Sequence, residues 1–390
     1  MIDDFFLEIH GAGFSNKGAE LMLLAIVDHF KRKYPSKKLA LNLRRGSFKK
    51  RASYGLHHLI WFETWRLPDL SWHIATSLNL AFALLPPKLR RLSNLVLDSE
   101  TSVLLDASGF AYSDQIGTVI PHLMARRSEK AKREGKKIIL LPQAFGPFHK
   151  RETRDQMTRI LAHADLVFPR DRLSNAYLED LGVRSSHIHI APDFTNLLEG
   201  RKPRTFSGKG RIAIIPNTRM LEMTSKSIQN AYMPFLLSCL DFYAQEGLDP
   251  FILLHEFGKD VEFAKQIQQQ MDNPVEVVRA DDPLEIKGII GDCDGVVSSR
   301  YHGLVNALSQ GVPTLAVGWS HKYTEIMMDY NVSQCLLSDI DDEETNIAAF
   351  RMLSTSYLRL ELQEIILEAA ALQKEMTRNM WDRIHEVIGS

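Results

Sequence analysis

Cysteine is scarce in this chain, and its scarcity excludes two kinds of structure. The 390 residues include only three cysteines, Cys239, Cys293 and Cys335. They lie far apart and lack the spacing of a zinc site or a disulfide framework. We therefore expect buried, reduced thiols in a cytoplasmic protein. No acidic cluster demands a metal ion either, so neither a metal nor a bound cofactor is predicted.

An excess of charge of one sign and long apolar runs are also missing. The 47 basic and 48 acidic residues leave a formal net charge of −1, which does not favour nucleic-acid binding. No apolar run reaches the roughly 18 residues that a membrane-spanning helix needs. The amino terminus also lacks the basic and apolar segments of a secretory signal. The composition is that of a soluble globular protein, and the length predicts two domains.

The most informative stretch of the sequence runs from 292 to 322. Short apolar segments at 295–297 and 314–317 predict two buried strands. The apolar residues between them have helical spacing, and Gly311 followed by a proline is typical of a helix end. The stretch therefore predicts one strand–helix–strand unit of a parallel sheet, and such sheets bind ligands at the carboxyl ends of their strands.

Cationic side chains gather at that predicted edge of the sheet. The loop after the first strand contains Ser299, Arg300 and His302 at a predicted helix N-terminus, where free N–H groups favour anions. The loop after the second strand adds Lys322. Two cationic loops on one rim predict a site for a small, highly charged anion.

A glycine-rich loop at 10–18 follows the first predicted strand. Its glycine spacing matches neither the dinucleotide motif G-x-G-x-x-G nor a P-loop, because Gly18 is not followed by Lys-Ser or Lys-Thr. The loop is either a tight turn between strand and helix or a substrate loop. In the second case Asn16, Lys17 and Glu20 would face the ligand.

Three further candidates follow predicted strands in the first half of the chain. Asp106 ends one strand, and Gln143 follows another in the stiff loop Pro-Gln-Ala-Phe-Gly-Pro at 142–147. Arg170 precedes Asp171 at the start of a predicted helix. This pair has two interpretations, a helix cap that fixes a loop, or an arginine that reaches toward a carboxylate or phosphate.

Aromatic residues are concentrated in segment 56–97, which includes Trp61, Trp65 and Trp72 and an apolar run at 74–85. We predict a helical insert that packs on the sheet or at a dimer contact. The alternative is peripheral contact with a membrane surface, which basic, aromatic, amphipathic segments often make.

These features together resemble the polysaccharide pyruvyl transferases, over most of residues 5–330. The strongest matches are Ser-Ser-Arg-Tyr-His-Gly at 298–303, Gly-Val-Pro-Thr-Leu-Ala-Val at 311–317 and His-Lys at 321–322. The loop at 142–147, the Arg-Asp element with its following serine at 170–174, and the Asn-x-Gly-x-Glu element at 16–20 are also similar. The chain departs from the family where a glycine run is usual, because only Ser108-Gly109 stands there.

Two successive alternations of predicted strands and helices, joined by a basic linker at 199–210, predict an α/β protein. Its two doubly wound, Rossmann-like domains would face each other across a cleft. The family resemblance implies the same GT-B-like layout. We assign residues 1–200 to an acceptor domain, 201–340 to a donor domain and 341–390 to C-terminal helices, the last of which we expect to reach back to the first domain.

The resemblance also implies a reaction. Family members transfer the pyruvyl group of phosphoenolpyruvate to two hydroxyls of a sugar in a cell-surface glycan, which forms a ketal. Phosphoenolpyruvate would be a co-substrate, and the acceptor a sugar or a lipid-linked oligosaccharide. A carboxylate and a phosphate need adjacent cations, so we predict donor binding by Arg300, Ser299, Lys322, Arg170, Asn217 and Arg219.

The remaining candidates divide between catalysis and acceptor binding. His302 is the expected proton donor, because an imidazole titrates near neutrality. Asp193, Glu20 and Asp106 are the candidate bases, and the acceptor-binding candidates are Asn16, Lys17, Gln143 and again Asp106. A glycosyltransferase that uses a nucleotide sugar, with Glu325 on the ribose, is the alternative function. A non-catalytic sugar-binding protein is a third possible function, but it would not explain why Arg300 and His302 occur together.

Overall fold

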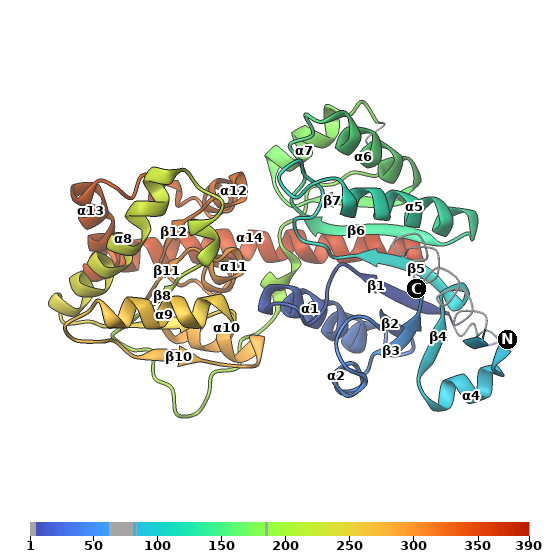
Figure 1. Cartoon of the computed structure of the whole chain (residues 1–390), viewed down its shortest axis with the longest axis horizontal. Helices are drawn as coiled ribbons and strands as arrows, with labels where there is room; N and C mark the ends of the chain where they lie inside the picture. Colours follow the sequence, from blue (N-terminus) through green and yellow to red (C-terminus); the bar gives the residue numbers. More distant parts are fainter. Residues whose placement is uncertain (1–4, 62–80, 83, 184–185, 390) are drawn as a thin grey trace. The chain divides into compact units, whose positions relative to one another are not determined.

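The computed structural model describes residues 5–61, 81–82, 84–183 and 186–389, which form two compact units (Figure 1). The first unit comprises Met1–Ala191 and Met380–Ser390, and the second comprises Pro192–Asn379. The three cysteines are buried and free, as expected. None of the helices in the described residues is both long and apolar enough to cross a membrane.

The first unit contains a seven-stranded parallel sheet with the strand order β4-β3-β2-β1-β5-β6-β7. The order reverses between β1 and β5, so the loops after these two strands leave neighbouring strand ends. The strands are β1 (Phe6–His10), β2 (Lys38–Asn42), β3 (His57–Ile60), β4 (Leu95–Leu97), β5 (Thr101–Asp106), β6 (Lys137–Gln143) and β7 (Leu166–Pro169).

Helices of the first unit connect and cover these strands. They are α1 (Lys17–Lys33), α2 (Phe48–Ser53), α4 (Pro87–Leu92), α5 (Val119–Arg133), α6 (Arg151–His163) and α7 (Arg172–Glu179). Apolar side chains of α5, α6 and α7 pack in one cluster with buried residues of β5, β6 and β7, such as Leu104, Leu140 and Val167. The strands expected at Asp106 and Gln143 and the helix expected after Arg170 are confirmed as β5, β6 and α7, with end points shifted by a few residues. The apolar residues at 188–191 also predict a strand, but Ile188 forms only an isolated bridge with Val167.

The prediction of a helical insert over 56–97 is wrong at both of its ends. His57–Ile60 and Leu95–Leu97 are strands β3 and β4 of the sheet. Both strands are very short, and β3 begins with two histidines, so neither shows a recognisable apolar pattern. Pairing of β3 with β2, and of β4 with β3, makes them strands, and a local pattern cannot reveal such pairing. The expectations for Trp65 and Trp72 concern 62–80, which lies outside the described residues.

The second unit contains a six-stranded parallel sheet with the order β10-β9-β8-β11-β12-β13. Its order reverses between β8 and β11. The strands are β8 (Arg211–Ile215), β9 (Asp249–Leu254), β10 (Val277–Arg279), β11 (Gly295–Ser298), β12 (Thr314–Val317) and β13 (Leu336–Leu337). The strand–helix–strand unit expected within 292–322 is therefore confirmed.

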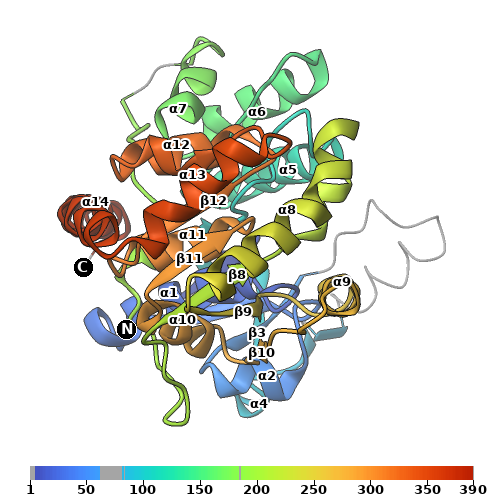
Figure 2. The ribbon, with the colours of Figure 1, turned by 90° about the vertical axis from the view of Figure 1, so that its left-hand side faces the viewer.

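Helices cover both faces of this second sheet. They are α8 (Lys226–Gln245), α9 (Lys259–Gln269), α10 (Pro283–Asp292), α11 (Tyr301–Leu308), α12 (His321–Asp329) and α13 (Glu343–Ser354). Alternate residues of β8 point to opposite faces: Ile212 and Ile214 join a core with α8 and α13, whereas Ala213 and Ile215 join one with α10. Figure 2 shows α8 and α10 on opposite sides of β8. Strands buried on both faces explain the continuous apolar runs in the sequence.

The division between the units differs from the predicted boundary at residue 200. Pro192 already belongs to the second unit, because the short helix η3 (Phe194–Leu197) is tied to helices of that unit. The C-terminal helices are also not a separate region. Helix α13 and the first part of α14 (Ser356–Ile388) pack in the core of the second unit, and the end of α14 belongs to the first unit.

Two histidines join the end of α14 to α1 within the first unit. His29 stacks on Trp381 with ring centroids 4.0 Å apart, and its Nε2 atom lies 2.8 Å from Nε2 of His385. Only one of these two nitrogens can carry the shared proton, so the contact requires at least one neutral ring. Burial, with the charges of His385 and Lys33, lowers the pKa of His29 to about 4.

This contact predicts a pH-dependent loss of stability. The unfolded pKa of a histidine is about 6.5, above the folded value, so the stabilisation is complete above pH 6.5 and is lost between pH 6.5 and about 4. His29→Phe keeps a ring on Trp381 without the titration. Between pH 7 and 4 the wild type should therefore lose about 1–2 kcal/mol more unfolding free energy than the variant, a figure reduced for partial exposure of the ring.

Differential scanning calorimetry at several pH values measures this difference. His149→Phe, at an exposed position of the same unit, is the matched control and should follow the wild type. Identical pH dependence of the wild type and His29→Phe would contradict the assignment.

Candidate functional site

The loop after β11 holds the residues that the sequence marks most strongly. The loop closes on itself, because Ser298 Oγ accepts a hydrogen bond of 3.1 Å from the backbone N–H of Arg300. Arg300 is the N-cap residue of α11. A Cβ atom on Gly303 would lie only 2.4 Å from Ser298 Oγ, so the first turn of this helix has no room for a larger residue. This contact explains the glycine that follows His302.

Ser299 and Asn217 are buried and hold neighbouring loops together. The amide nitrogen of Asn217 donates to the carbonyl oxygen of Ser299 at 2.8 Å, and the hydroxyl of Tyr323 donates to the same oxygen at 2.9 Å. The hydroxyl of Tyr232 donates to Ser299 Oγ at 2.8 Å. These bonds join the loops after β8 and β11. Both Ser299 and Asn217 were predicted to bind a donor. In the structure their polar atoms hold the loops after β8 and β11 in position.

Arg300 is paired with two carboxylates. Its Nη1 lies 2.9 Å from Glu256 Oε1, and its Nη2 contacts Asp260 Oδ2. Asp260 is buried and also accepts a 3.1 Å hydrogen bond from the hydroxyl of Thr218. Asp260 therefore fixes the guanidinium at the N-terminus of α11, while the carboxylate of Glu256 is the more exposed of its two partners.

His302 and Asp193 lie side by side, although the sequence separates them widely. Nε2 of His302 is 3.6 Å from Oδ2 of Asp193, and both side chains are largely buried. The other carboxylate oxygen of Asp193 accepts from the backbone N–H and the hydroxyl of Thr195, at 3.1 and 2.6 Å. Since Oδ1 is thus engaged, Oδ2 is the oxygen that faces the imidazole.

The other two predicted donor cations of the second unit, Lys322 and Arg219, have different surroundings. The ammonium of Lys322 lies over the ring of Trp319, 4.7 Å from its centroid, and 5.5 Å from those of Tyr301 and Tyr323. These aromatic neighbours were not predicted. Arg219 is mostly exposed and pairs with Glu222 at 3.0 Å. The structure therefore brings together Arg300, His302, Asp193, Ser299 and Asn217, whereas the guanidinium of Arg219 is directed to an exposed partner.

The candidates of the glycine-rich loop gather at the start of α1 in the first unit. Asn16 is the N-cap, and its side-chain oxygen accepts from the N–H of Ala19 at 2.7 Å. Glu20 is buried and contacts Lys17 at 3.2 Å, Lys50 at 2.8 Å and the hydroxyl of Tyr54 at 2.7 Å.

The contacts of Glu20 determine its ionisation. Burial by itself would raise the pKa of Glu20, but the hydrogen bonds from Lys50 and Tyr54 and the charge of Lys17 outweigh it and lower the pKa. A carboxylate held ionised in this way is a weak base. The Asn16 cap confirms the interpretation of this loop as a tight turn between strand and helix. A role of its residues in substrate binding stays a prediction.

Asp106 and Gln143 are fully buried and bonded to each other. Gln143 Nε2 donates to Asp106 Oδ2 at 3.0 Å, and the hydroxyls of Ser108 and Tyr112 donate to the same carboxylate at 2.6 and 2.8 Å. Burial and the charge of Asp106 raise the pKa of Tyr112. The carboxylate therefore acts as the centre that shapes the loop after β5.

The Arg170–Asp171 element begins helix α7. Asp171 is its N-cap and accepts a 2.6 Å hydrogen bond from the backbone N–H of Ser174, so the capping interpretation is confirmed for the aspartate. Arg170 is buried beside it. A role for this arginine in donor binding stays a prediction.

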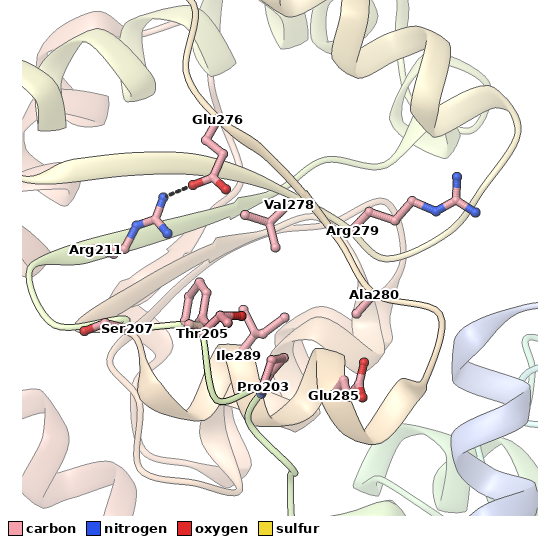
Figure 3. A pocket seen from close by; sticks show the side chains of 11 residues that line it. Pro203, Thr205, Ser207, Arg211, Glu276, Val278, Arg279, Ala280, Glu285 and Ile289 are labelled. Atoms are coloured by element: carbon pink, nitrogen blue, oxygen red, sulfur yellow. Dashed lines mark hydrogen bonds and ion pairs between the residues drawn. The ribbon is translucent and has the colours of Figure 1, made fainter.

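A separate pocket of about 470 Å³ lies elsewhere in the second unit (Figure 3). It is bordered by the loop at 203–207, by β10 and by α10, and Arg211 on its wall is ion-paired with Glu276 at 2.7 Å. None of the predicted site residues lines it.

No group of three or more histidine, cysteine, aspartate or glutamate residues within the described ranges has the arrangement of a metal site.

Comparison with solved structures shows the class of fold. A glycosyltransferase from Rickettsia africae is 11% identical with a TM-score of 0.59, and the match covers 99% of each chain. HepE from Anabaena in complex with UDP is 14% identical with a TM-score of 0.56, over 98% of this chain and 99% of that one. MnaA from S. aureus in a structure with UDP is 12% identical with a TM-score of 0.59, over 99% and 97%.

At these identities the likeness concerns the fold alone, which is a GT-B-like arrangement of two Rossmann-like units. The family is shown by a match to the model for polysaccharide pyruvyl transferases over residues 16–321, more than half of the chain. The chain belongs to that family, and it is an enzyme of polysaccharide biosynthesis.

Proposed function

We propose that this protein transfers the pyruvyl group of phosphoenolpyruvate to two hydroxyls of one sugar in a cell-surface polysaccharide or its precursor. The observation that supports the proposal most is the pairing of His302 with the buried carboxylate of Asp193, two residues from Arg300 at a helix N-terminus. A proton donor next to an anion-binding element is what the pyruvyl-transfer reaction needs. Family membership points to the same chemistry.

The proposed reaction begins with protonation of the donor and ends with ketal closure. A proton added to the methylene carbon of phosphoenolpyruvate makes a methyl group and an oxocarbenium-like centre at the adjacent carbon. One sugar hydroxyl attacks this carbon, and the bond from carbon to the phosphate oxygen then breaks. The second hydroxyl attacks and closes the ketal. Of the two hydroxyl protons, one replaces the proton used on the methylene carbon and the other leaves with the phosphate.

In this proposal His302 supplies the proton and Asp193 stabilises its imidazolium. The carboxylate oxygen lies 3.6 Å from the ring nitrogen, close enough to stabilise a positive charge on the imidazole by its own negative charge. Asp193 was predicted as a base for the sugar. Its position beside the histidine favours the role of a partner instead, since a carboxylate in an ion pair is a poorer base for a hydroxyl.

The donor anion would be bound by Arg300, with Lys322 as the second cation. A guanidinium can hold a carboxylate or phosphate with two parallel hydrogen bonds, and the N-terminus of α11 adds backbone N–H groups. Ser299 and Asn217 would keep this loop in place. Arg170 and Arg219 remain donor candidates, and the acceptor would be bound by Asn16, Lys17, Gln143 and Asp106. Glu20 remains a candidate base for a sugar hydroxyl, although its lowered pKa makes it a weak one.

A glycosyltransferase that uses a nucleotide sugar is the second candidate. It is supported by the shared fold with HepE and MnaA, whose structures contain UDP. Glu325, in α12, would then bind the ribose. This function has no need for a proton donor beside Arg300, so the His302–Asp193 pair favours pyruvyl transfer.

Solvent deuterium distinguishes these two reactions. The protein is incubated in deuterated water with phosphoenolpyruvate and polysaccharide from cells that lack the gene. The ketal methyl should carry one solvent deuterium, with one phosphate released per ketal, because the added proton comes from solvent through His302. NMR spectroscopy of the product measures both quantities. His302→Ala should lower the rate by about 10²–10⁴-fold.

UDP-sugars replace phosphoenolpyruvate in a parallel reaction. Release of UDP without any deuterated methyl group would overturn the proposal and favour the glycosyltransferase.

Glu256 generates a second prediction, because it neutralises part of the proposed donor site. Glu256→Gln removes a negative charge 2.9 Å from Arg300 and leaves Asp260 to hold the guanidinium. The affinity for phosphoenolpyruvate should rise about 3- to 10-fold, the size expected for a partly exposed ion pair. Isothermal titration calorimetry measures the dissociation constant.

Glu262→Gln is the matched control for this change. Glu262 lies in the same helix, α9, and pairs with Lys265 at the surface, so its loss should not alter binding. Weaker binding by Glu256→Gln would mean that Glu256 belongs to the arrangement the donor requires.

The surface around α4 supports a lipid-linked acceptor. Leu84, Leu89 and Leu92 are 77%, 54% and 82% exposed, and Lys88 is exposed among them. Apolar side chains with a basic residue suit the interface of a membrane with anionic lipids. We therefore propose that α4 touches the membrane that carries the acceptor.

This contact predicts binding to lipid vesicles. The double variant Leu89→Gln with Leu92→Gln should reduce the fraction that sediments with phosphatidylglycerol-containing vesicles at least about threefold, because it removes the apolar contacts. Leu360→Gln with Leu372→Gln, at exposed positions of α14, is the control. A wild-type protein that does not sediment with the vesicles would contradict the proposal.

A further inference from the structure

Lys287 is a fully buried lysine in α10 that the reaction described above does not use. Its ammonium nitrogen donates to the carbonyl oxygen of Thr195 at 2.9 Å and to the hydroxyl of Ser309 at 3.1 Å. Lysine is among the residues least often buried, because removing its amine from water is costly. A buried lysine that spans two other elements therefore calls for a specific reason.

One of these two elements carries Asp193. We define the Asp193 strap as residues 192–198, which include η3. Thr195, whose carbonyl receives the bond from Lys287, also donates its N–H and hydroxyl to Asp193 Oδ1. The strap has a second anchor, because Asn196 donates to the hydroxyl of Thr377 in α14 at 2.9 Å. Asp193 is thus held by a segment that α10 and α14 both fix.

The other element carries His302. Ser309 is the C-cap residue of α11, and His302 is in the first turn of the same helix. Lys287 therefore bonds to both the Asp193 strap and helix α11, and the separation of these two elements sets the 3.6 Å distance between Asp193 Oδ2 and His302 Nε2. A shift of either element by a fraction of this distance would separate the two side chains.

We propose that Lys287 is a positioning residue that holds the carboxylate of Asp193 against His302. The inference rests on the proposed role of His302 as the proton donor. Lys287 acts through its two hydrogen bonds, and it touches neither the donor nor the acceptor.

The charge of Lys287 is not required for this role. Burial lowers its pKa to about 7, with the negative charge of Asp193 acting in the opposite direction and the positive charge of Lys374 adding to the decrease. Both the ammonium and the neutral amine have enough N–H groups for two acceptors. A glutamine side chain amide offers two N–H groups as well, so it can replace the bonds without the charge.

The test compares two substitutions at this position. Lys287→Met removes both hydrogen bonds and should lower kcat about 10-fold, while the KM for phosphoenolpyruvate changes less than about twofold, since Arg300 is untouched. Lys287→Gln should restore most of kcat. Phe235→Leu, a change in the core of the same unit, controls for a general loss of stability.

A double-mutant cycle separates positioning from simple destabilisation. Because Lys287 acts through the Asp193–His302 pair, Lys287→Met should have no further effect on kcat in a His302→Ala background. An equal fold-loss in both backgrounds, or an unchanged kcat in Lys287→Met, would overturn the inference. If Lys287→Met does not fold, Ser309→Ala takes its place in the cycle, with an expected loss of about threefold that also vanishes without His302.

Hydrogen exchange measures the anchoring without any assay of activity. Peptides covering residues 192–198 should exchange faster in Lys287→Met than in the wild type, and at the wild-type rate in Lys287→Gln. If the wild type forms no ketal, the proposed function fails, and the exchange decides whether Lys287 anchors the strap. Unchanged exchange in Lys287→Met would overturn the anchoring itself.

Discussion

Strands β8 and β11 lie side by side where the strand order of the second sheet reverses, and the candidate site depends on this constraint. Their carboxyl ends carry Asn217 on one loop and Ser299 with Arg300 on the other. The bond between Asn217 and Ser299 joins the two loops. Tyr232 and Tyr323 brace the same point from α8 and α12. The proposed anion-binding element is therefore built on the carboxyl edge of the sheet, as ligand sites in parallel sheets usually are.

Charge balance is the second feature of the site. Arg300 has two acidic partners and His302 has one, so each of these two side chains lies beside a carboxylate. An uncompensated buried charge would cost several kcal/mol, so these pairs are needed for stability whatever ligand binds. They also leave the more exposed carboxylate, Glu256, as the partner that a donor anion would displace from Arg300 most easily.

In the first unit the loops at the carboxyl ends of the strands carry carboxylates that hold the loops together. Asp106 accepts from three side chains and Glu20 from several donors, so both carboxylates organise their surroundings. The first unit also buries Arg127 between Glu8 and Asp98, an ion-pair cluster without a signal in the local sequence. Asp106 and Glu20 therefore stabilise the loops around them through hydrogen bonds and ion pairs with neighbouring side chains.

Short motifs in the sequence were sufficient to predict the family, the two doubly wound units and the loop with Arg300 and His302. Those features depend on local order: apolar runs of strand length, helix ends at glycine or proline, and residues that lie within one loop. Strands β3 and β4, the pairing of Asp260 with Arg300 and the approach of Asp193 to His302 were beyond prediction. Each of them depends on which distant segments become neighbours, and a local pattern contains no information about that choice. For the same reason, the role of Lys287 as a positioning residue could be proposed only from its contacts with Thr195 and Ser309 in the folded chain.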